Sequence, residues 1–128
     1  MNPRLLAATI AAGRVAFGTA LAIAPARAAR IWIGSASDVP GARVVMRATG
    51  ARDIALGMGL LMALRHGKPI RGWVEAGAVV DSADVAITLM SFRHLPTPGR
   101  VLTVASAAAV AALSMRIAGE VDRADERM

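Results

Sequence analysis

Residues 101–115 read VLTVASAAAVAALSM, a stretch without a single charged residue. Its only polar side chains are those of Thr103, Ser106 and Ser114. A helix that is apolar on all sides is either enclosed by a large core or spans a membrane. Because a chain of 128 residues cannot build a soluble core that surrounds it, the stretch predicts a membrane-spanning helix from about Pro98 to Ala118.

The composition of the whole chain supports this interpretation. Hydrophobic residues make up 55% of the sequence, and the mean hydropathy of +0.51 exceeds that of most soluble domains. Aromatic residues are only 3% of the chain. A soluble core normally uses several aromatic rings to fill its volume, whereas helices in lipid pack through small residues.

Three further apolar segments precede the decisive stretch. The run from Leu5 to Ala24 matches the roughly 30 Å hydrocarbon core at roughly 1.5 Å per residue, and Pro25 ends it. Ser37 and Asp38 before Pro40 are typical of an N-cap that starts the next helix. The predicted spans are residues 5–24, 40–65, 70–92 and 98–118, followed by a solvated tail at 119–128. We therefore predict one domain, residues 1–128, folded as an all-α, antiparallel four-helix transmembrane bundle.

Two alternatives to this arrangement stay open. The first run could be a signal peptide, since a basic start precedes it and Ala24-Pro-Ala26 resembles a cleavage site. Its length and the central Arg14 favour a span, but cleavage would leave three spans. A soluble bundle is the second alternative.

Residues 26–37 are amphipathic and suited to the headgroup level, with Trp32 as the predicted interface anchor.

The positive charge of the chain predicts a membrane partner and not nucleic acid. The formal net charge is +6 and the pI about 11.6, but the basic residues are scattered between apolar runs, as expected beside anionic headgroups. An amino terminus on the inner side of a bacterial cytoplasmic membrane is weakly favoured by the distribution of basic residues. The inner set would be Arg4, Arg65, Lys68, Arg71, Arg116, Arg123 and Arg127, and the outer set Arg27, Arg30, Arg43, Arg93 and Arg100.

Charged residues inside the predicted spans define the candidate site. When the spans are aligned antiparallel, Arg14, Asp53 and Asp81 share the midplane of the bilayer. Arg47 and Asp84 lie together further out, where we expect them to pair. A charge at the centre of a span costs roughly 2.5 to 3.5 kcal/mol on insertion scales, so these residues need partners. The candidate ligand or proton site comprises Arg14, Arg47, Arg52, Asp53, Asp81 and Asp84.

This cluster has two main interpretations. It could be a buried network of salt bridges that only fixes the order of the helices. It could instead line a polar cavity for a substrate, a lipid headgroup or a proton, and a small hydrophobic or anionic ligand is an expected partner. A divalent metal at Asp81 and Asp84 is less favoured, because magnesium usually also binds substrate phosphates and the chain has no phosphate loop. We predict no metal site and no cofactor, and the absence of Cys excludes disulfides and thiolate ligands.

Three functions fit these observations. The favoured one is a binding or accessory module around the charged cluster. The first alternative is a proton-coupled small-molecule transporter in which Asp53 or Asp81 titrates beside Arg14. The second alternative, an enzyme or enzyme subunit in the membrane, would use Asp81 and Asp84 as acid and base. Beyond the lipid bilayer, a second copy or another membrane protein is an expected partner. The small-residue face at Ala105, Ala108, Ala109 and Ala112 fits such a contact or internal packing equally well.

Three segments carry a resemblance to a known group of proteins. They are Gly50-Ala-Arg52-Asp53-Ile-Ala-Leu-Gly57, the basic turn Arg65-His-Gly-Lys68, and Val80-Asp81-Ser-Ala-Asp84. Over about residues 5–118 the chain resembles small bacterial four-helix membrane proteins known as a domain of unknown function and broadly similar to DoxX-like proteins. The resemblance implies a four-helix fold with shared Arg-Asp and Asp-x-x-Asp patterns and no settled activity. DoxX-like proteins include a quinone-linked oxidoreductase subunit, but no redox ligand in this chain supports that role.

The four-span format is also similar to that of small multidrug transporters. Those proteins use a membrane-embedded Glu in their first helix, where this chain has Arg14. Its acidic residues lie in the second and third predicted spans instead.

Overall fold

The computed structural model describes residues 2–125, and the side chains of residues 2–120. Within this range the chain forms helices and turns and contains no strand. The helices are α1 (Pro3–Ile23), α2 (Pro25–Ile33), α3 (Pro40–Arg65), α4 (Arg71–Met90) and α5 (Thr97–Asp125), with short 3-10 turns η1 (Gly34–Asp38) and η2 (Phe92–His94). The predicted all-α class is confirmed for the described residues.

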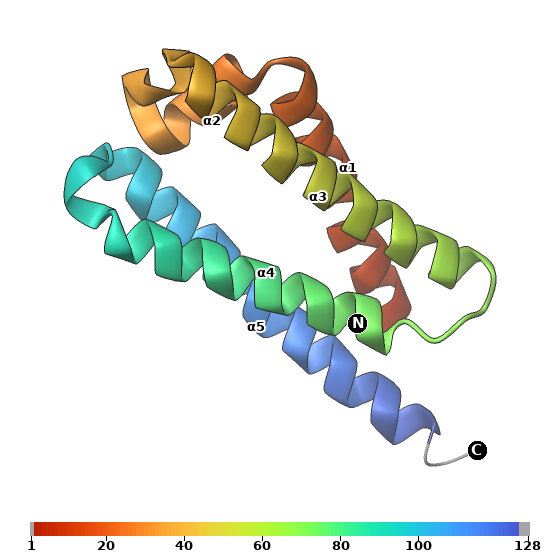
Figure 1. The fold of residues 1–128 in the computed structure, drawn as a ribbon. Helices are drawn as coiled ribbons and strands as arrows, with labels where there is room; N and C mark the ends of the chain where they lie inside the picture. The colour runs from red at the N-terminus through yellow and green to blue at the C-terminus, as the bar shows by residue number, and fades with distance from the viewer. Residues whose placement is uncertain (1, 126–128) are drawn as a thin grey trace.

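The four long helices form two antiparallel pairs. Helix α1 lies along α3, and α4 lies along α5 (Figure 1). Helix α2 and the η2 turn lie at one end of the bundle, and the α3–α4 loop lies at the other end together with the start of α1 (Figure 1). Contacts between the pairs are sparser than contacts within them.

Glycines bring α1 and α3 into backbone contact. A Cβ atom on Gly50 would lie 2.5 Å from the carbonyl oxygen of Gly18, and one on Gly57 would lie 2.6 Å from that of Ala11. Side chains at these positions would force the helices apart. Glycine at these positions therefore permits the close approach of α1 and α3.

The predicted cap of α3 is wrong. The N-cap residue is Val39, which makes no side-chain capping bond, although Pro40 does occupy the first turn. Ser37 instead donates a hydrogen bond to the carbonyl oxygen of Gly34 at 2.8 Å, within η1. Asp38 forms an ion pair with Arg30 at 2.7 Å. Both polar side chains therefore make contacts outside α3 and do not cap it.

The apolar core lies toward the end of the bundle that holds the start of α1 and the α3–α4 loop. The main cluster consists of Ala7, Ala11, Leu60, Ala63, Ile70, Val74, Ile117 and Ala118. A smaller cluster of Leu21, Ala29 and Met46 lies near α2. One end of the bundle is therefore well packed, and the half near α2 holds fewer buried apolar side chains.

The exterior of the described chain is unusually apolar. Helix α1 and the part of α5 from Thr97 to Glu120 are long and apolar enough to cross a membrane, with mean hydropathies of 1.6 and 1.8 over their most apolar windows. Only 22% of each window is buried, so neither is the enclosed core helix of a soluble monomer. Helices α3 and α4 do not meet this criterion, and the four-span bundle stays a prediction.

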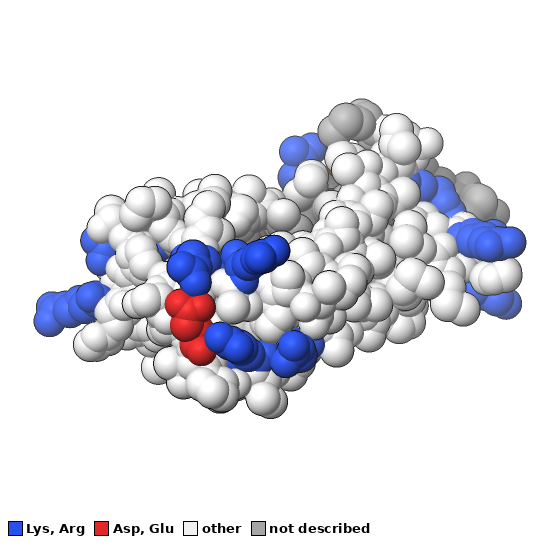
Figure 2. Space-filling model, turned by 90° about the horizontal axis from the view of Figure 1, so that it is seen from above, with Lys and Arg blue, Asp and Glu red and all other residues white. Residues whose placement is uncertain are grey.

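Part of this exterior carries no charged side chains. In Figure 2, acidic atoms form one spot with Lys and Arg around it, and an uncharged stretch separates this spot from basic residues at the far end. The face of α5 formed by Ala105, Ala108, Ala109 and Ala112 is exposed, so it does not serve internal packing. The helix continues through the start of the predicted tail to Asp125. The side chains of Arg123 and Arg127 lie outside the described residues.

Candidate functional site

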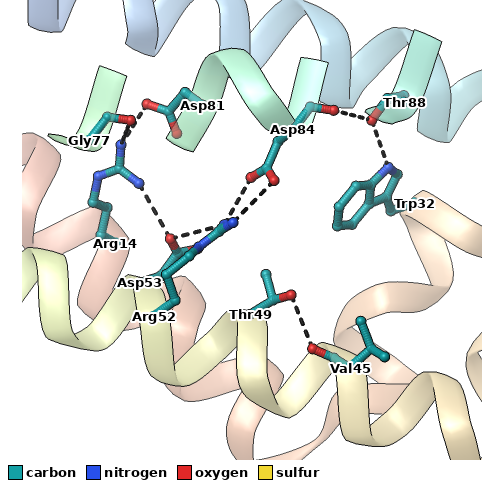
Figure 3. Close-up of polar contacts among 10 residues, drawn as sticks. All are labelled: Arg14, Trp32, Val45, Thr49, Arg52, Asp53, Gly77, Asp81, Asp84 and Thr88. Carbon is teal, nitrogen blue, oxygen red and sulfur yellow. Dashed lines mark hydrogen bonds and ion pairs between the residues drawn. The ribbon is translucent and has the colours of Figure 1, made fainter. Parts of the chain in front are cut away.

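Arg14 lies at the centre of the charged cluster. It projects from the middle of α1 toward α3 and α4 (Figure 3). Its Nη1 donates to Oδ1 of Asp53 at 3.4 Å, and its Nη2 donates to Oδ2 of Asp81 at 2.5 Å. Nη2 also donates to the carbonyl oxygen of Gly77 at 3.0 Å. The predicted meeting of Arg14, Asp53 and Asp81 at one level of the bundle is confirmed.

These three residues are almost completely removed from the surface. Asp53 is 5% exposed and Asp81 7% exposed, and the side chain of Arg14 is 10% exposed. A Cβ atom on Gly77 would lie 2.9 Å from Nη2 of Arg14, so the glycine leaves the space that the guanidinium occupies. Breaking an ion pair that is buried this deeply is costly, because the charge that remains is not solvated by water.

Arg52 forms the second part of the cluster. Its Nη2 lies 2.9 Å and its Nη1 3.3 Å from the two carboxylate oxygens of Asp84, a bidentate pair between α3 and α4. Nη2 also lies 3.4 Å from Oδ1 of Asp53. The cluster is therefore continuous from α1 through α3 to α4 (Figure 3). Nε of Arg52 is buried and has no partner within the described chain.

The predicted pairing of Arg47 with Asp84 is wrong. Nε of Arg47 donates instead to the carbonyl oxygen of Ala22 on α1 at 3.2 Å. At roughly 100° per residue, Arg47 and Arg52 lie on opposite flanks of Asp53 on the surface of α3. The flank of Arg47 is turned to α1, and that of Arg52 to α4. Arg47 was predicted as the partner of Asp84 from its depth in the bundle alone. The rotation of α3 about its axis instead turns Arg52 toward Asp84.

A link between Trp32 and Thr88 ties α2 to α4 beside the cluster. Nε1 of Trp32 donates to Oγ1 of Thr88 at 3.3 Å. The same hydroxyl donates to the carbonyl oxygen of Asp84 at 2.7 Å. This link fixes the indole ring of Trp32 one helical turn beyond Asp84.

The cluster forms the polar floor of an open cavity of about 490 Å³. Arg14, Asp53, Asp81 and Asp84 line it, together with apolar walls from α1, α2 and α5. The wall residues include Ile10, Phe17, Ile31, Trp32, Leu102 and Val110. The charges therefore pair with one another and also face a pocket of the size of ordinary small-molecule sites, roughly 300 to 1,000 Å³.

The cavity reaches past Arg14 to Thr9 and Ile10 on α1. A second void of about 10 Å³, on the side of the packed core, is also lined by Arg14 and has Leu60, Val74 and Ser114 among its other residues. Such a void has room for about one water molecule. Arg14 and Ile10 thus lie between a wide pocket near α2 and the packed end of the bundle.

Several of these features were not predicted from the sequence. The carbonyl oxygen of Gly77, the contact between Trp32 and Thr88, and the polar residues Thr103 and Ser106 in the cavity wall were missed. Thr103 and Ser106 lie three residues apart and thus on one side of α5. Their spacing within an otherwise apolar run was the one available signal.

Metal binding finds little support at this site. Asp81 and Asp84 both line the cavity, but each is hydrogen bonded to an arginine. In the part of the chain that the structure describes, no group of three or more His, Cys, Asp or Glu is placed to hold a metal ion.

No protein-family model, curated protein or solved structure matches this chain. The resemblance to DoxX-like proteins therefore stays a prediction. Over the described residues, the fold and the site define an all-helical protein in which a buried Arg–Asp cluster lines an open cavity.

Proposed function

We propose that this chain is a small integral membrane protein whose four long helices cross the bilayer and that binds a small amphipathic molecule in the cavity above Arg14. The cavity of about 490 Å³ with a charged floor and apolar walls is the observation that carries the proposal. A cluster that only held helices together would need no such space beside it.

The outward-facing side chains of α3 and α4 support four spans. Val44, Val45, Met58 and Met62 of α3 are largely exposed, as are Val79, Ile87, Leu89 and Met90 of α4. Of the charges that lower the average hydropathy of these helices, Asp53 and Asp81 point inward, whereas Arg43 and Arg47 near the start of α3 are exposed. Beyond these two arginines, lipid would meet a largely apolar surface on α3 and α4.

The ends of the bundle also fit this arrangement. Exposed basic residues gather at both ends of the bundle, near α2 on one side and near the α3–α4 loop on the other. Lys and Arg are favoured beside headgroups. The contacts of α1 with α3 and the position of Arg14 in the cluster favour a retained first span over a cleaved signal peptide.

Labelling of introduced cysteines tests the number of spans. The chain has no Cys of its own, so Ser35→Cys in η1 and Lys68→Cys in the α3–α4 loop can be labelled singly with a membrane-impermeant maleimide in sealed vesicles. Four spans place these residues on opposite sides of the membrane. If both variants react from the same side, α3 does not cross the bilayer and the proposal fails.

Blocking the cavity tests binding. No atom lies within 4 Å of a Cβ placed on Gly13, which lines the cavity, and the same holds for Gly41 at the start of α3. Gly13→Leu should project a bulky side chain into the pocket, whereas Gly41→Leu is a matched control outside it. Trp32 fluorescence in a Trp73→Phe background reports binding of phenylbutanol to protein in lipid nanodiscs. We expect saturable binding that Gly13→Leu removes and Gly41→Leu retains, and equal responses in both variants would refute the proposed site.

A proton-coupled transporter is the second candidate. The position of Arg14 between a wide cavity and a packed end favours this function. In an alternating-access cycle, each conformational state of the transporter is open toward one side of the membrane and closed toward the other. The ion pairs of Arg14 with Asp81 and of Arg52 with Asp84 also bridge the two helix pairs, which would have to move relative to each other. Substrate-dependent proton flux in liposomes should vanish in Asp53→Asn or Asp81→Asn, and flux that survives both changes would exclude this function.

An enzyme is the least supported of the three functions. The geometric condition for it is met, since Asp81 and Asp84 both line the cavity. However, Asp81 is bound by Arg14 and Asp84 by Arg52. Each carboxylate is thus already engaged in an ion pair with an arginine.

A further inference from the structure

We infer that the molecule held in the cavity is a hydrophobic monocation, with an ammonium or amidinium group directed at Asp53 and Asp81. The first reason is the balance of charge at the floor. Two guanidinium groups, of Arg14 and Arg52, meet three carboxylates, of Asp53, Asp81 and Asp84. With all five ionised, the cluster carries one uncompensated negative charge, which is unfavourable in apolar surroundings. One bound cation would neutralise it.

The hydrogen-bonding capacity at the floor points the same way. Arg14 donates to Oδ1 of Asp53 and to Oδ2 of Asp81. The other carboxylate oxygen of each residue receives no hydrogen bond from the described chain, although an ionised carboxylate has about four acceptor sites. Ser106, across the cavity on α5, donates to the carbonyl oxygen of Leu102 and keeps its own oxygen free to accept. Acceptors are thus available to a ligand that donates.

The nitrogen donors beside the cavity are, by contrast, already engaged, although Thr103 in the wall keeps a hydroxyl that is free within the described chain. Both terminal nitrogens of Arg14 are hydrogen bonded, and Nε1 of Trp32 donates to Thr88. Arg52 is paired with Asp84 and does not line the cavity. An anion would have to displace a carboxylate from Arg14, whereas a cation can bind without disrupting any ion pair.

The walls of the cavity indicate that the part of the ligand away from its cationic group is apolar. Phe17, Ile31 and Leu102 line the cavity and are about half exposed, so its mouth between α1, α2 and α5 is apolar. In a bilayer such a mouth meets lipid, and an amphipathic cation would enter from the membrane with its apolar part against these side chains. The indole of Trp32, also in the wall, can face a cation with its ring.

The test compares three ligands that share one tail, and it rests on the proposed function. Phenylbutylammonium, phenylbutanol and phenylbutanoate are titrated separately into the protein in neutral-lipid nanodiscs, with Trp32 fluorescence as the readout. We expect the cation to bind at least about tenfold more tightly than the alcohol, because a single close charge interaction is worth more than that even after partial desolvation. The anion should bind most weakly. Since the comparison uses the unmodified cluster, it does not depend on a variant that fails to fold.

A variant then places the preference at the cluster. Asp81→Asn removes one negative charge and should reduce the preference for the cation to less than about threefold, while Gly13→Leu should abolish binding of all three ligands. If the alcohol or the anion binds as tightly as the cation, the inference is wrong but the binding function stands. If none of the three binds in a manner sensitive to Gly13→Leu, the proposed function itself fails.

Two sources could supply such a cation, a free hydrophobic amine or the ammonium group of a lipid. Repeating the titration with phosphatidylethanolamine added to the nanodiscs distinguishes them. Weaker apparent binding of phenylbutylammonium assigns the site to the lipid ammonium group, and unchanged binding assigns it to a free amine.

Discussion

Replacing Arg14 with Met should destabilise the bundle far more than replacing an exposed arginine. Arg14→Met keeps a long apolar side chain but removes contacts to Asp53, Asp81 and Gly77. Loss of one partner of a buried ion pair typically costs 3 to 5 kcal/mol, because the other charge stays buried without compensation. With two carboxylates involved, at 5% and 7% exposure, we expect at least about 3 kcal/mol of the free energy of unfolding to be lost.

The structure also predicts which second change restores stability. After Arg14→Met, Asp53 still lies 3.4 Å from Nη2 of Arg52. Asp81 keeps no ion-pair partner within the described chain. Arg14→Met combined with Asp81→Asn should therefore recover more stability than Arg14→Met combined with Asp53→Asn. A cluster of equivalent, independent pairs would give equal recovery.

The matched control is the ion pair between Arg30 and Asp38. Its N–O distance of 2.7 Å is close to that of the Arg14–Asp81 pair, but its side chains are 60% and 47% exposed. Exposed pairs contribute about 0 to 1 kcal/mol, so Arg30→Met should cost little. Reversible unfolding in mixed micelles, followed by circular dichroism, measures all variants. If Arg14→Met costs no more than Arg30→Met, the cluster is not a buried, energetically coupled network.

Two further outcomes follow from the same contacts. Arg52→Met should cost roughly 1.5 to 3 kcal/mol of the free energy of unfolding, the usual loss of hydrogen bonds to a charged group. The cost is smaller than for Arg14→Met because the Arg52 side chain is 33% exposed and that of Asp84 is 19% exposed. A loss above that of Arg14→Met in the same unfolding assay would contradict this order. Gly50→Val should cost about 1 to 3 kcal/mol or more, because its Cβ would meet the carbonyl oxygen of Gly18 at 2.5 Å. Gly13→Ala, with no atom within 4 Å of the new Cβ, should be neutral or stabilising, and equal effects of the two glycine changes would count against the tight contact between α1 and α3.

Helix positions and the depth of each charge were predictable because the rise per residue is fixed. That regularity placed Arg14, Asp53 and Asp81 at one level, and the structure joins them there. The same reasoning misassigned the partner of Asp84. Depth is a local property of a helix, whereas the flank that it turns to a neighbour depends on how the helices pack.

The sequence by itself determined the helical class, an apolar exterior and a central Arg–Asp cluster, since these depend on residue type and spacing along one chain. Only the tertiary structure decided that the two helix pairs leave a cavity of about 490 Å³ above Arg14, walled by α1, α2 and α5. The size of that space depends on how far apart and at what rotation the pairs meet. Those are properties of contacts between distant residues, such as Arg52 with Asp84 and Trp32 with Thr88, and no single helix encodes them.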